Sequence, residues 1–162
     1  MAYESENRLN EFVFQNCEMN LSGYDGNTIM MNAEYLSVSK NSAENPHGCD
    51  MQADGAVLSL GGFTVQRFFI SSWNEFHEEE YDEFGIPIED GSLRGEEAVK
   101  AFCDELRRGI AITDFGIHMG GGHFLSAMTT GGKMLEVRFM FSSAKVSWEG
   151  YSGKAWYENR RR

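Results

Sequence analysis

Apolar and polar residues alternate along much of the chain, a pattern typical of half-buried β-strands. The clearest example is residues 133–141, where Glu136 and Arg138 separate apolar neighbours. Residues 144–149 alternate in the same way. Because only Ser142 and Ser143 separate these two runs, we expect them to form a hairpin.

The first forty residues predict a second pair of strands. Residues 11–20 and 27–40 are rich in Phe, Val, Ile, Met and Tyr, and residues 21–26 between them contain the glycines that a hairpin connection needs. These runs are therefore expected to pair as antiparallel strands. Residues 41–54 are rich in Asn, Ser, Pro, Gly and Asp, and we expect them to form a surface loop.

Further strands are predicted on either side of the middle of the chain. Residues 56–71 form either one strand or two strands that meet at a corner, since Gly61 and Gly62 interrupt the run. Residues 110–118 and 123–129 flank a glycine-rich joint, and the second of these runs leads into the strand at 133–141 as a meander.

One amphipathic helix is predicted between Ser92 and Gly109. Acidic residues in its first turn and arginines in its last turn suit the helix dipole, and Gly109 is a natural stop. Its expected buried face consists of Val99, Phe102, Cys103 and Leu106. The predicted fold class is therefore α+β, mainly antiparallel sheet in hairpins and a meander with one main helix packed on it, in a single domain over residues 1–162.

Negative charge is concentrated in one part of the chain. The protein has 162 residues and a net charge of −11, and residues 75–105 alone contain twelve acidic and two basic residues. The centre of this stretch is residues 75–84, where Phe76, Tyr81 and Phe84 interrupt the acids. We expect residues 74–92, the acidic segment, to be a loop that attracts a basic protein, because like charges held together repel and a cationic partner relieves that repulsion.

The interface predicted on this segment combines carboxylates that steer the partner with aromatic anchors that bury against it. Its residues are Phe76, Glu78, Glu79, Glu80, Tyr81, Asp82, Glu83 and Phe84. In composition the chain resembles the small acidic immunity proteins and antitoxins that inhibit a bacterial toxin such as a nuclease. That resemblance implies a non-enzymatic inhibitor without a cofactor. A solvated loop that only keeps the protein soluble, or the interface of an accessory subunit in a larger assembly, is the alternative interpretation.

A different hypothesis is a small metal-dependent or ligand-binding enzyme. His118 and His123 flank a run of three glycines, so the two imidazoles could converge on one ion. The spacing matches no known metal motif, and three successive glycines cannot sustain the helix that a zinc-protease motif requires.

The end of the chain is rich in aromatic residues and ends in a basic group. We expect Trp156 and Tyr157 to be the side chains there most suited to face a ligand, since nearby glycines let the chain bend over the sheet. Residues 158–162 include three arginines and are expected to fray. The net negative charge makes direct binding of nucleic acid an unfavourable interpretation.

The expected location is the cytoplasm. No apolar run approaches the roughly 20 residues that cross a bilayer, and Glu4, Glu6 and Glu11 stand where a secretory signal would be basic and then apolar. The three cysteines fit no disulfide or metal spacing, so we expect reduced thiols, of which only Cys49, in a polar loop, is a candidate for reactivity.

Overall fold

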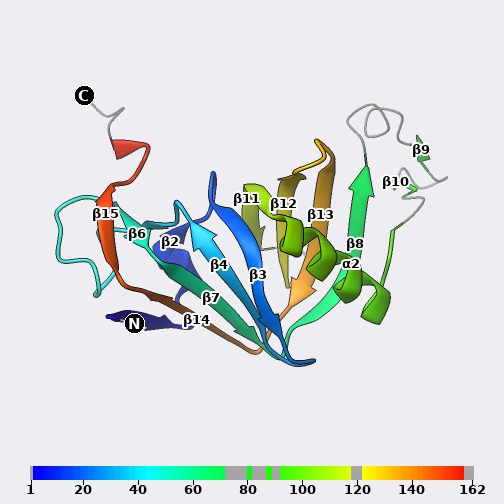
Figure 1. Cartoon of the computed structure of the whole chain (residues 1–162), viewed down its shortest axis with the longest axis horizontal. Coiled ribbons are helices and arrows are strands. Elements are labelled where there is room, and N and C mark those ends of the chain that lie inside the picture. The colour runs from blue at the N-terminus through cyan, green and yellow to red at the C-terminus, as the bar shows by residue number, and fades with distance from the viewer. Residues whose placement is uncertain (1, 72–79, 82–86, 89–91, 118–121, 159–162) are drawn as a thin grey trace.

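Figure 1 shows a computed structural model of the chain, which describes residues 2–71, 80–81, 87–88, 92–117 and 122–158. Within these residues the protein is a mainly antiparallel β-structure with one main helix packed on it, so the predicted α+β class is confirmed. The helix is α2 (Gly95–Arg108), and a single 3-10 turn, η1 (Leu9–Glu11), precedes the second strand.

The strands form two principal sheets. The larger sheet contains, in spatial order, β1 (Tyr3–Glu6), β14 (Ser143–Trp148), β7 (Ala56–Gly61), β4 (Ile29–Glu34), β3 (Glu18–Tyr24), β11 (Ile110–Ile117), β12 (His123–Thr129), β13 (Met134–Met140) and β8 (Thr64–Ser71). The smaller sheet contains β15 (Gly150–Lys154), β6 (Met51–Asp54), β5 (Ser37–Val38) and β2 (Phe12–Val13).

The hairpin predicted in the first forty residues is confirmed, but it is divided between the two sheets. β3 pairs with β4, while β2 and β5, which continue the same two runs, pair in the smaller sheet. Asn16 and Tyr35 both have positive φ, 68° and 62°, and they turn the two runs at matching positions. The predicted strands were therefore too long, because each bends where its backbone enters the left-handed region.

The loop predicted over residues 41–54 is shorter than expected. β6 occupies its last four residues, pairs with β5 and β15, and buries Ala53. The carboxylate of Asp50 also accepts a hydrogen bond from the backbone N–H of Lys40, which closes the loop at its base. Strand pairing with distant residues overrides the polar local sequence here.

Residues 56–71 form two strands that meet at a corner, as one of the two sequence predictions had it. β7 pairs with β14, and β8 pairs with β13. The segment from β7 to β8 and the segment from β13 to β14 therefore cross the corner side by side. The hairpin predicted between residues 133–141 and 144–149 is therefore wrong, because β13 and β14 are not neighbours in the sheet. The Ser142 backbone N–H instead donates to the carbonyl of Gly61, which makes Ser142 part of the corner.

The predicted helix is confirmed, with its start at Gly95 rather than directly after Ser92. It ends at Arg108, and the next residue, Gly109, closes the last turn with a φ of 93° and a backbone N–H that donates to the carbonyls of Glu105 and Leu106. Ala98, Phe102 and Leu106 are at most 1% exposed and pack α2 against β8 and β3. Figure 1 shows the helix lying across this part of the larger sheet.

One continuous core joins the sheets and the helix. Alternate residues of the strands point into it, including Leu135, Val137 and Phe139 of β13, as the sequence pattern predicts. Trp148 is fully buried, stacks on Tyr3 with ring centroids 5.5 Å apart, and meets the edge of Phe12 at 5.6 Å. These contacts join the end of the larger sheet to the smaller one.

Candidate functional site

The acidic segment is attached at both ends to the same edge of the larger sheet. β8 ends at Ser71, and beyond the segment Leu93 pairs with Phe68 of β8 through two backbone hydrogen bonds of 2.9 and 2.8 Å. Inside the segment β9 (Glu80–Tyr81) pairs with β10 (Pro87–Ile88) in an antiparallel ladder. The chain thus leaves β8 and returns to it, so this edge of the sheet carries both ends of the segment.

Most of the predicted interface side chains are not described by the structure. Phe76, Glu78, Glu79, Asp82, Glu83 and Phe84 lie outside the described residues. For Glu80 and Tyr81 the structure gives only the backbone pairing with β10.

α2 begins two residues after Leu93 and extends the acidic region. Glu96 and Glu97 lie in its first turn, and both are exposed. At the other end of the helix, Asp104 and Glu105 accept hydrogen bonds from arginines three residues further along, at 2.6 and 3.1 Å. The acids at the C-terminal end are therefore locally compensated, whereas those of the first turn add to the charge beside the acidic segment.

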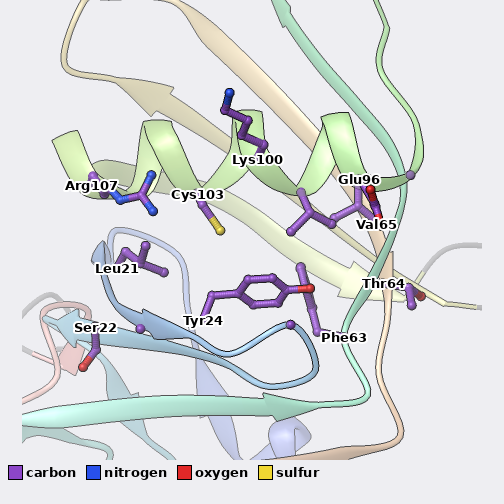
Figure 2. Close-up of a pocket in the computed structure, with 14 residues that line it drawn as sticks. Leu21, Ser22, Tyr24, Phe63, Thr64, Val65, Glu96, Lys100, Cys103 and Arg107 are labelled. Atoms are coloured by element: carbon purple, nitrogen blue, oxygen red, sulfur yellow. The ribbon is translucent and has the colours of Figure 1, made fainter.

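A groove of about 870 Å³ lies between α2, the β3–β4 hairpin and the start of β8. Its apolar lining is Leu21, Phe63, Val65 and Val99, and its polar lining includes Tyr24, Glu96, Cys103 and Arg107. In Figure 2 the Cys103 thiol points down from the helix toward the ring of Tyr24, and Arg107 extends along the helix above Leu21. The same view shows Lys100 pointing away from the groove.

The phenol of Tyr24 and the thiol of Cys103, both in the groove lining, are neutral at physiological pH. Partial burial raises the pKa of the Tyr24 hydroxyl, and the nearby Cys103, Asp25 and Glu96 raise it further. Burial also raises the pKa of the Cys103 thiol, although the adjacent Arg107 guanidinium opposes that shift. Cys103 is thus an unactivated thiol, and Tyr24 is available as a hydrogen-bond donor.

Sequence reasoning did not identify this groove. Its walls come from three segments distant in the chain, and pairing of β3 with β11 and packing of α2 on β8 bring them together. The one local signal was the spacing of Val99, Cys103 and Arg107, which places them along one side of a helix. Val99, predicted to be buried, is half-buried because it faces the groove.

Of the two histidines hypothesised to bind a metal, the structure describes only one. His118 lies outside the described residues, and His123 opens β12 opposite Ile117. The His123 ring is half-buried among aromatic side chains, with its centroid 4.5 Å from that of Phe141 and 5.9 Å from that of Phe139. Burial lowers the pKa of His123. Within the part of the chain that the structure describes, no three His, Cys, Asp or Glu side chains gather as metal ligands.

The aromatic residues near the end of the chain have structural contacts. Trp156 and Tyr157 are half-buried, with their rings edge to face and centroids 5.3 Å apart. The Tyr157 hydroxyl donates a hydrogen bond to the Asp50 carboxylate, which fixes this turn on the loop before β6. Their predicted role in facing a ligand stays a prediction.

No protein-family model, curated protein or solved structure matches this chain. In the described ranges, no helix is long and apolar enough to cross a membrane.

Proposed function

We propose that this protein is a non-enzymatic binding protein whose acidic segment, residues 74–92, docks a basic surface of a protein partner. The observation that carries the proposal is that residues 75–105 have a net charge of −10, and that the chain pairs with the edge strand β8 directly after the acidic segment. The Leu93–Phe68 pairing ties the chain after the acidic segment to β8, the strand that precedes the segment, and the first turn of α2 adds Glu96 and Glu97. A field of this density speeds the approach of a cationic protein and disfavours anionic ones.

Anchoring the segment at both ends also favours tight binding. A chain whose ends are fixed has fewer conformations to lose when it binds, so more of the interaction energy remains as affinity. In this proposal the carboxylates of residues 78–83 steer the partner. Phe76, Tyr81 and Phe84 supply the apolar anchors that carry most of the binding energy in protein interfaces.

The partner class that this arrangement suits best is a basic toxin, such as a nuclease, whose cationic surface binds nucleic acid. An acidic protein that covers such a surface competes directly with the nucleic acid for the same charges. The proposed role is therefore that of an immunity-type or antitoxin-type inhibitor in the bacterial cytoplasm.

Affinity capture from lysate of the source organism tests the proposal. Wild-type protein is compared with a Glu79→Lys, Glu80→Lys variant and with a control, Glu18→Lys, Glu34→Lys, which makes the same change in net charge. Glu18 and Glu34 are exposed and lie opposite each other on β3 and β4. The control therefore exchanges two neighbouring glutamates for two lysines, as the test variant does.

We expect one basic protein to be retained by the wild type and the control, and to be lost with the Glu79, Glu80 variant and at raised salt. Addition of the purified chain should then inhibit the activity of the captured protein. Retention of nothing specific, or equal loss with both variants, would contradict the proposal.

A further inference from the structure

We propose that the groove between α2 and the β3–β4 hairpin binds a small amphipathic monocarboxylate, with its carboxylate at Arg107 and its apolar chain over Leu21, Phe63 and Val99. This site is separate from the docking surface proposed above, since none of its lining belongs to residues 74–92.

The size and lining of the groove suit a small molecule. Its volume of about 870 Å³ lies within the range of about 300–1,000 Å³ that is typical of ligand sites in proteins. Such sites are mainly apolar with a few polar groups that fix the orientation of the ligand. Here the ring of Tyr24, which is 36% exposed, and the half-buried side chains of Leu21 and Val99 offer apolar surface that a ligand can cover.

Arg107 supplies the positive charge at one end of the groove. Its Nη1 donates to the Asp104 carboxylate at 2.6 Å, which uses one of the five N–H donors of a guanidinium. Arg107 follows Cys103 by about one turn of α2 and lines the same groove, into which the Cys103 thiol points. A guanidinium in this position fits a carboxylate, which accepts two parallel hydrogen bonds from it.

Glu96 sets the polarity of the site. It lines the opposite end of the groove, eleven residues before Arg107, which corresponds to about 16 Å along the helix. A negative group on the ligand is therefore attracted at the Arg107 end and repelled at the Glu96 end. A chain with a single carboxylate is expected to bind better than the same chain with a carboxylate at each end.

The test uses octanoate, decanoate, octanol and octanedioate as probes, with affinities measured by calorimetry and the site located by amide NMR shifts. Arg107→Met removes the proposed contact and keeps an apolar stem. Arg108→Met is a matched control, since Arg108 is the next residue of the same helix, is similarly exposed and has an equivalent ion pair with Glu105, but does not line the groove.

We expect Arg107→Met to weaken octanoate binding about tenfold or more, because it removes the charge-assisted hydrogen bonds to the carboxylate, and to leave octanol binding unchanged. Arg108→Met should change neither affinity. Decanoate should bind more tightly than octanoate, by up to about fourfold for each added methylene, and octanedioate should bind more weakly.

Three results would overturn the proposal. The first is that both arginine variants weaken octanoate binding equally. The second is that octanoate does not bind to folded wild-type protein, as judged by a normal melting temperature. The third is that octanoate shifts only amides outside α2, β3 and the start of β8. Each can occur whether or not the acidic segment binds a basic protein.

Discussion

At the scale of single residues, the aromatic surroundings of His123 give it a definite pH dependence. Its ring contacts Phe115, Phe139 and Phe141, so the imidazolium loses hydration in the folded state and the pKa falls below the ordinary value of 6.5. The unfolded chain therefore binds the proton more readily than the folded one. His123 contributes full stability above a pH of about 6.5, and this contribution is lost as the pH falls toward its lowered pKa.

Replacement of His123 by Phe tests this linkage, because the variant keeps the aromatic contacts and removes the titrating group. When the pH is lowered from about 7.5 to about 5.5, we expect the melting temperature of the wild type to fall further than that of the variant. Thermal unfolding at both pH values measures the difference. An identical pH dependence in the two proteins would show that His123 is not desolvated.

At the scale of elements, the corner between β7 and β8 depends on Gly62. Its φ is 65°, in the left-handed region, and a Cβ at this position would collide with the Ser142 side chain. Because β13 and β14 cross the same corner, strain at Gly62 would reach both halves of the larger sheet. This corner positions β8, and with it one wall of the groove and the edge that holds the acidic segment.

We expect Gly62→Ala to destabilise the fold by about 1–3 kcal/mol, the usual cost of a non-glycine residue held in a strained conformation. Gly131→Ala is the control, since the nearest atom to its added Cβ is the Thr129 Oγ1 at 3.8 Å, an ordinary contact. The control should stay within about 0.5 kcal/mol of the wild type in denaturant unfolding. Equal effects of the two changes would refute the assigned role of the corner.

The elements also show how far sequence reasoning reaches. The helix and the strands at 123–129 and 134–140 were predictable, because each buries one regular face. The strand at 110–117 alternates only as far as Ile112, where a register shift in its pairing with β12 interrupts the pattern. The pairing of β13 with β14 was predicted wrongly, because a two-residue connection looks like a hairpin turn until its partner is known. Gly61 is that partner for Ser142, and it lies about eighty residues earlier in the chain.

The candidate site was predictable to a smaller extent than the fold. Charge density is visible in sequence, so the acidic segment could be identified without a structure. The groove could not, since Leu21, Phe63 and Val99 become neighbours only through packing of α2 on the sheet. His123 was identified as a candidate, but its aromatic neighbours Phe115 and Phe141 come from β11 and from the residue after β13 and were not linked to it by spacing.

At the scale of the whole molecule, the net charge of −11 is a source of instability that salt should relieve. We expect the melting temperature to rise when sodium chloride increases from about 0.01 M to about 0.15 M, since the Debye length falls from about 30 Å to about 8 Å. The rise should be smaller for Glu79→Lys, Glu80→Lys than for Glu18→Lys, Glu34→Lys. Equal responses would mean that the repulsion is spread over the surface and is not concentrated in the acidic segment.

The central claim is that the acidic segment recognises a basic protein, and the affinity of the purified complex at two salt concentrations tests it most directly. For the protein captured by the wild type, we predict that Glu79→Lys, Glu80→Lys weakens binding about tenfold or more, mainly through slower association. The predicted salt dependence of this variant is shallower than that of the wild type, while Glu18→Lys, Glu34→Lys keeps near wild-type affinity. Equal affinities and equal salt dependence for all three proteins would contradict the account.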